Sequence, residues 1–308
     1  MRDRPPASNV GIKRASGDDM TEETLSPAWA DVVFAGAPDA IPDDRVVCIR
    51  IGVLDFACRL KLGAPGDRLM VHLLGAIPAG TEAPTLKETV FPDGFHVLTI
   101  SDPSLLLDLA LRRGVFLGPR LQDPHEGVSD IVSAVARQLG RTPEETLFYG
   151  ASGSGIAGCM AAIRLGARCV AVNAQLDLYA ARKTPHALIM QKMFDPEYHY
   201  AKIRRAYPHR LQVASAYTQA VAEGRSPRLM IYQNRRDLIH YEGFYRPFCK
   251  LMKLDPLDGV TEDGRVRVTV LKYPGGHKLR PDKALALIAR SLAFLYPGEG
   301  EGEAREAA

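Results

Sequence analysis

The stretch FYGASGSGIAG, residues 148–158, fits two patterns that imply different proteins. Its second half, from Gly153 to Gly158, is a G-x-G-x-x-G loop, which brings the pyrophosphate of a dinucleotide to a helix N-terminus. Its centre, GASGS, is close to G-x-S-x-G, the sharp strand-to-helix turn that exposes a nucleophilic serine, here Ser152. The rest of the chain has to decide between a nucleotide-binding protein and a serine hydrolase.

The composition is typical of a globular protein and gives no indication of a nucleic-acid, metal or membrane partner. The 308 residues are 46% hydrophobic and 24% charged, which is enough apolar material for a large core. The net charge is +3 and is spread without long runs, so nothing indicates a nucleic-acid surface. The five cysteines form no C-x-x-C pair, and we expect no metal. No run of eighteen apolar residues is present, so we expect no membrane span and a cytoplasmic location.

The two ends of the chain differ in composition from its middle. Residues 1–30 combine Pro, Ser, Gly and charged residues with few apolar ones, which predicts a flexible N-terminal arm. Residues 298–308 have the same character and are expected to form a flexible tail. A single domain over 31–297 is predicted between them.

Within this domain, short β-rich runs alternate with longer helical patterns, which predicts an α/β fold with a mostly parallel sheet and helices on both faces. Eight strands are expected, at residues 45–51, 54–62, 68–75, 95–101, 146–150, 167–173, 227–234 and 265–273. The first two are so closely joined that they should be antiparallel. Helices are expected at residues 127–140, 155–166, 211–224, 241–253 and 282–296.

The position of the glycine-rich stretch in this order weakens the dinucleotide interpretation. A dinucleotide loop usually follows the first strand of its fold, whereas this stretch follows the fifth. An acidic residue should also end the next strand and bind the ribose, but Asn173-Ala174-Gln175 stands there. Asp177 lies slightly further on and could still serve.

The serine-hydrolase interpretation requires an acid and a histidine later in the chain, and both occur in the required order. Asp237 follows the seventh strand and His277 follows the eighth. Because the carboxyl ends of parallel strands lie at one edge of a sheet, Ser152, Asp237 and His277 can converge. The tetrahedral intermediate also needs N–H donors, and we expect them from Gly153 and from Ala76 in the loop after the third strand.

At this point the chain resembles a group of bacterial α/β-hydrolase-like proteins associated with surface-glycan biosynthesis, whose turn has the form Y-G-S-S-A-G-G. The resemblance covers roughly residues 45–296. Besides 148–163 it extends over Ile100–Pro103, Gly114–Gly118, Val172–Gln175, Tyr232–Asn234, Asp237, His240, Tyr241 and Gly275–His277. It implies the α/β-hydrolase fold and the Ser152, Asp237 and His277 triad. The chain departs from the group at Ser154, where glycine is usual, and we expect this side chain to crowd the turn.

Structural roles are alternatives for several of these residues. Ser152 could cap the following helix, and Asp237 could pair with a neighbouring arginine, leaving Asp177 as the triad acid. The long segment 174–210 is expected to form a cap over the site. Tyr179, Tyr198 and His240 are candidates for lining a substrate pocket, although the cap could equally pack its own core.

The sequence therefore predicts a serine hydrolase of the α/β-hydrolase class that acts on small-molecule or glycan esters or thioesters and needs no cofactor. An acyltransferase with the same triad is the main alternative. A nucleotide-binding oxidoreductase that uses GSGIAG and a scaffold protein with a degenerate triad are two others. The oligomeric state is not predicted.

Overall fold

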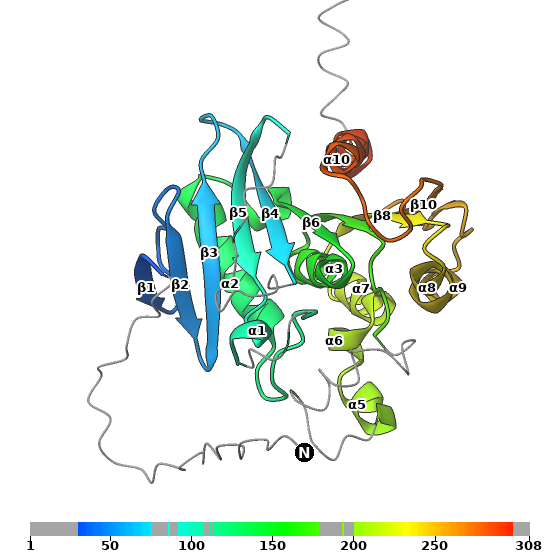
Figure 1. The fold of residues 1–308 in the computed structure, drawn as a ribbon, viewed down its shortest axis with the longest axis horizontal. Helices are drawn as coiled ribbons and strands as arrows, with labels where there is room; N and C mark the ends of the chain where they lie inside the picture. The colour runs from blue at the N-terminus through cyan, green and yellow to red at the C-terminus, as the bar shows by residue number, and fades with distance from the viewer. Residues whose placement is uncertain are drawn as a thin grey trace, which may run out of the picture.

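The computed structural model describes residues 30–75, 86, 92–107, 111, 114–178, 193 and 200–297. A ten-stranded sheet runs through the molecule in the order β1-β2-β3-β5-β4-β6-β7-β8-β10-β9 (Figure 1). Its strands are β1 (Val32–Ala35), β2 (Val46–Ile51), β3 (Leu54–Lys61), β4 (Arg68–Leu74), β5 (Phe95–Ser101), β6 (Leu147–Ala151), β7 (Arg168–Val172), β8 (Arg228–Asn234), β9 (Asp258–Val260) and β10 (Val266–Leu271).

All eight expected strands are present, but the expected number is wrong because β1 and β9 extend the sheet at its two edges. Strand β1 has four residues and β9 has three, so neither is long enough to show a clear alternation of apolar and polar residues. Each depends on pairing with one neighbour, β2 or β10.

The direction of the strands confirms the α/β-hydrolase fold. Strand β3 is antiparallel to β2 and β5, as expected from the short connection between β2 and β3. From β5 through β4, β6, β7 and β8 to β10, every neighbouring pair is parallel. The carboxyl ends of these strands therefore lie at one edge of the sheet, where the loops that carry the expected site residues begin.

Helices cover both faces of this sheet (Figure 1). They are α1 (Ser104–Leu107), α2 (Pro124–Gln138), η1 (Pro143–Glu145), α3 (Gly153–Leu165), α5 (Tyr200–Ala206), α6 (Pro208–Leu211), α7 (Val213–Ala222), α8 (Leu238–His240), η2 (Tyr241–Tyr245), α9 (Arg246–Leu251) and α10 (Pro281–Leu295). All five expected helical segments contain helix. The fourth, at residues 241–253, is divided into the π-helical turn η2 and α9, and the short helix α8 precedes it.

Two apolar clusters hold the layers together. Helices α2, α3 and α7 pack in the larger cluster on one face, while α10 packs on the other face against β6, β7 and β8. Helix α10 buries Ala284, Ile288 and Leu295, three of the residues that recur at helical spacing in the sequence. Strands β6, β7 and β8 are thus covered on both sides, which fixes the loops at their carboxyl ends.

Several expectations lie wholly or partly outside the described residues. The N-terminal arm, apart from residue 30, and the tail at 298–308 are outside. Of the cap segment, residues 174–178, 193 and 200–210 are described, and they include α5 and most of α6. In the part of the chain that the structure describes, no helix is long and apolar enough to cross a membrane.

His72 in β4 makes the stability of the fold sensitive to acid. Burial lowers the pKa of this imidazole from 6.5 to about 4. As the pH falls from about 6.5 to about 4, His72 becomes protonated in the unfolded chain but stays neutral in the folded chain, so the free energy of unfolding decreases. We expect His72→Gln to remove up to about 3 kcal/mol of this decrease, measured by urea unfolding at several pH values. Parallel pH profiles for the two proteins would contradict this role of His72.

Candidate active site

The turn between β6 and α3 holds Ser152 in an unusual backbone conformation. Its φ is 56° and its ψ is −122°, a region that residues with a side chain seldom occupy. Ser152 occupies the N-cap position of α3, but its side chain makes no capping hydrogen bond. The structure therefore gives no support to the interpretation of Ser152 as a helix cap. Its Oγ makes no hydrogen bond to any residue that the structure describes.

Glycines surround this turn because there is no room for a side chain. A Cβ atom on Gly150 would lie 2.2 Å from the carbonyl oxygen of Ser154, and one on Gly153 would lie 2.7 Å from that of Gly114. A Cβ on Gly155 would lie 2.7 Å from Cβ of Ala174. These contacts explain the three glycines by the close packing of the turn, without a bound pyrophosphate.

Ser154 braces the turn, and the expectation that it crowds the turn is wrong. Its hydroxyl donates to the carbonyl oxygen of Ala151 at 2.8 Å and accepts from the N–H of Ala151 at 3.1 Å. These two bonds close the first helical turn onto the end of β6. The sequence could not show this, because only the backbone conformation at Ser152 brings Ser154 next to Ala151.

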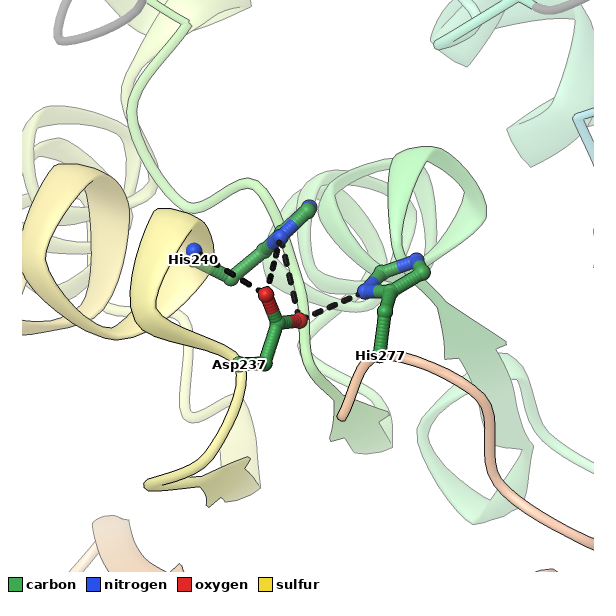
Figure 2. Close-up of side chains that lie close together, drawn as sticks. All are labelled: Asp237, His240 and His277. Atoms are coloured by element: carbon green, nitrogen blue, oxygen red, sulfur yellow. Dashed lines mark hydrogen bonds and ion pairs between the residues drawn. The ribbon is translucent and has the colours of Figure 1, made fainter. Parts of the chain in front are cut away.

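Asp237 and His277 form a close pair at the ends of β8 and β10. Nδ1 of His277 lies 2.6 Å from Oδ2 of Asp237, which fits a hydrogen bond donated by the ring (Figure 2). Asp237 is buried, whereas the side chain of His277 is 41% exposed. The alternative acid, Asp177, instead accepts a hydrogen bond from Gln212 at 2.8 Å. The histidine expected as the base is thus joined to Asp237.

A second histidine contacts the same carboxylate. His240, at the end of α8, places its Nδ1 3.1 Å from either oxygen of Asp237. Its ring stacks on that of His277, with ring centroids 4.2 Å apart (Figure 2). The sequence suggested His240 for the substrate pocket, and that role stays a prediction, but its observed partners are Asp237 and His277.

The two imidazoles keep Asp237 ionised. Burial alone would raise the pKa of this carboxyl, but the hydrogen bonds from His240 and His277 outweigh burial, and the pKa lies well below its usual value. A carboxylate in this state can hold an imidazole in one tautomer, with the proton on Nδ1 and the lone pair on Nε2. Nε2 of His277 is then free to accept a proton.

Two buried asparagines hold the loop that carries His277. Asn173 follows β7 and donates through Nδ2 to the hydroxyl of Tyr273 at 2.7 Å and to the carbonyl oxygen of His277 at 2.9 Å. Asn234 ends β8 and donates to the carbonyl oxygens of Gly276 at 2.6 Å and Tyr273 at 3.1 Å. The sequence alone predicts no role for these asparagines, although both stand at the carboxyl ends of neighbouring strands.

The same asparagines connect the histidine loop to the serine turn. Oδ1 of Asn173 accepts from the N–H of Asn234 at 2.7 Å. The N–H of Ser152 donates to the carbonyl oxygen of Val172, the residue before Asn173, at 3.1 Å. The N–H of Gln175 in turn lies 3.3 Å from the carbonyl oxygen of Ser152. A short series of hydrogen bonds therefore fixes the serine turn and the His277 loop relative to one another.

The expected oxyanion donors are only partly within the described residues. Gly153 is the first residue of α3, where backbone N–H groups have no partner within the helix. Ala76 lies outside the described residues, but the preceding Gly75 accepts from the N–H of Gly114 at 2.8 Å beside the serine turn. Tyr179 and Tyr198 also lie outside the described residues. Their roles stay predictions.

Comparison with known proteins identifies the fold. No protein-family model and no curated protein matches the chain. The capsule O-acetyltransferase of Neisseria meningitidis serogroup A has a similar structure, with a TM-score of 0.56 and 12% identity over 83% of this chain and 96% of that chain. A chain of the Glycosylation Associate Protein (Gap123) complex from Streptococcus agalactiae has a TM-score of 0.54 and 10% identity over 79% of this chain and 46% of that one. At these identities the similarity shows a shared fold.

The strain at Ser152 predicts a difference between two substitutions that both delete the hydroxyl. Ser152→Gly should be more stable than Ser152→Ala by about 1 kcal/mol, because glycine adopts a positive φ without steric cost whereas alanine does not. Urea unfolding of the two variants measures this difference. An alanine variant as stable as the glycine variant would show that the positive φ at Ser152 carries no strain.

Proposed function

We propose that the protein is a serine-dependent acyl-transfer enzyme that hydrolyses esters or thioesters. Ser152 is the nucleophile, His277 the general base and Asp237 the residue that orients the base. The observation that carries this proposal is the hydrogen-bonded pair of His277 and Asp237 after β10 and β8, and a serine held in a strained turn at the end of β6 supports it.

In the proposed first step, Nε2 of His277 takes the proton of Ser152 while Oγ attacks the acyl carbon. The N–H of Gly153 donates to the oxyanion, and the positive end of the α3 dipole stabilises it. The protonated histidine then gives its proton to the leaving oxygen or sulfur as the bond to the acyl carbon breaks. Water, activated by the same histidine, attacks the acyl-serine and releases the acid.

The geometry of the turn favours this function over dinucleotide binding. Contacts within the protein occupy the space beside Gly150, Gly153 and Gly155, so the glycines are explained by packing. Asp177, the acid that would have to bind a ribose, instead accepts a hydrogen bond from the side-chain amide of Gln212. Both observations support the serine-hydrolase interpretation of the opening stretch.

Labelling with a fluorophosphonate tests this proposal without knowledge of the substrate. We expect the wild-type chain to react at Ser152 and Ser152→Ala not to react. His277→Ala should slow the reaction at least about a thousandfold, because the base is lost. His209→Ala, which removes an exposed histidine, serves as the matched control and should react like the wild type. Equal labelling of Ser152→Ala at another serine would remove Ser152 from its proposed role.

Transfer of the acyl group to a sugar hydroxyl instead of water is the second candidate. It is supported by the fold shared with a capsule O-acetyltransferase, which covers 83% of this chain. The chemistry of the first step is the same, and only the acceptor differs.

Product analysis with an aryl acetate in the presence of mono- and oligosaccharides separates hydrolysis from transfer. Under the preferred proposal, free acetate is the main product, and its rate of formation does not depend on the sugar. Ser152→Ala gives the background rate. If acetylated sugar were the main product, hydrolysis would be rejected in favour of acyl transfer to a sugar hydroxyl.

A further inference from the structure

The acyl-transfer proposal gives His240 no step of its own beyond helping to keep Asp237 ionised. A triad uses one histidine, yet a second imidazole lies against the same carboxylate with its side chain only 11% exposed. Two imidazoles and one carboxylate therefore lie together, and each of the three groups can ligate a metal ion. The arrangement therefore needs an explanation beyond the triad.

The three groups have the geometry of a metal site. Nδ1 of His277 and Nδ1 of His240 lie 2.6 Å and 3.1 Å from Oδ2 of Asp237, and one atom from each residue lies within 4.8 Å of the other two. Figure 2 shows both rings turned toward the carboxylate. Ligand atoms about 2.0 to 2.2 Å from a tetrahedral zinc ion lie about 3.3 to 3.6 Å from one another, so movements of about 1 Å would create the site.

We propose that Asp237, His240 and His277 bind a divalent ion of the zinc type, and that this ion reversibly inhibits the enzyme. The inhibition rests on the proposed acyl-transfer function, whereas the binding itself does not.

The ligands suit zinc and give it access from solvent. Two imidazole nitrogens and one carboxylate oxygen are ligands that zinc binds in tetrahedral sites, with a fourth position open to water. The side chains of Asp237 and His240 are 6% and 11% exposed, so they form the fixed part of the site. His277 is 41% exposed and lies on a loop, and it gives the ion a path to the other two ligands.

Metal binding would change the tautomer of the proposed base. A neutral imidazole carries one ring proton, which lies on Nδ1 of His277 while that atom donates to Asp237. When zinc binds Nδ1, the proton moves to Nε2 and none is lost overall. Nε2 then has no lone pair for the proton of Ser152. The ion thus inhibits the first step without covering the serine.

Gln175 can support the metal-bound state of His240. Nε2 of His240 lies 3.5 Å from the side-chain nitrogen of Gln175. In the metal-free state this amide can donate to the Nε2 lone pair. Once zinc moves the proton to Nε2, a flip of the amide allows its oxygen to accept. Such a partner on the second ring nitrogen is usual for histidines that bind zinc.

Titration of the full-length chain with Zn²⁺ by calorimetry, and with Co²⁺ by visible absorption, tests the binding. We expect one ion per chain. His240→Asn keeps an N–H donor toward Asp237 but loses the ring nitrogen that would bind the ion. Its zinc affinity should fall at least about 100-fold, because losing a group that only hydrogen-bonds to a ligand already costs up to about that factor. His277→Asn, in the exposed loop, is a second variant with the same expectation. His209→Asn is the matched control and should bind zinc like the wild type.

Two further measurements separate this inference from the proposed function. Ser152→Ala should bind zinc as the wild type does, because the serine is not a ligand. Zinc should slow fluorophosphonate labelling of the wild type, and a chelator should restore it. No binding, or equal affinity in the wild type, His240→Asn and His277→Asn, would overturn the site. Binding without slower labelling would overturn the inhibition, whereas a chain that never labels but still binds zinc would contradict only the proposed function.

Discussion

The structure around the candidate site depends on one constraint, the reversal of the chain from β6 into α3 within a single residue. Ser152 makes this reversal with a φ of 56°. The reversal brings Gly150, Gly153 and Gly155 so close to other atoms that none of them has room for a Cβ. The hydroxyl of Ser154 then closes the turn by bonding to both polar groups of the Ala151 backbone. Packing and hydrogen bonds around Ser152 thus stabilise its strained backbone conformation.

Hydrogen bonds of two asparagines to the backbone hold the histidine loop in place relative to this turn. Asn173 and Asn234 are buried at the ends of neighbouring strands and bind carbonyl oxygens of the loop between Tyr273 and His277. Buried amides without partners are costly, so these bonds select one loop conformation. The loop places the ring of His277 against Asp237, which fixes the direction of Nε2.

Much of this arrangement could be predicted from the sequence, because it follows from strand order. The eight longer strands show clear patterns, and the residues that follow the fifth, seventh and eighth of them are Ser152, Asp237 and His277. The two short edge strands could not be predicted, since their pairing depends on neighbours. The contacts of Asn173 and Asn234, and the stacking of His240 on His277, also depend on three-dimensional proximity between segments far apart in the chain. The same is true of the metal ligands, since positions 237, 240 and 277 form no compact motif and the sequence suggested no metal.

The central claim is that Ser152 becomes acylated. The most direct test is mass spectrometry of the chain after brief mixing with an aryl acetate, followed by acid quenching and peptide mapping. The account predicts an acetyl group on the peptide that contains Ser152, at a level that decays as water attacks, and none on that peptide in the Ser152→Ala variant. Turnover of the ester with the acetyl group trapped on a different residue would contradict the account.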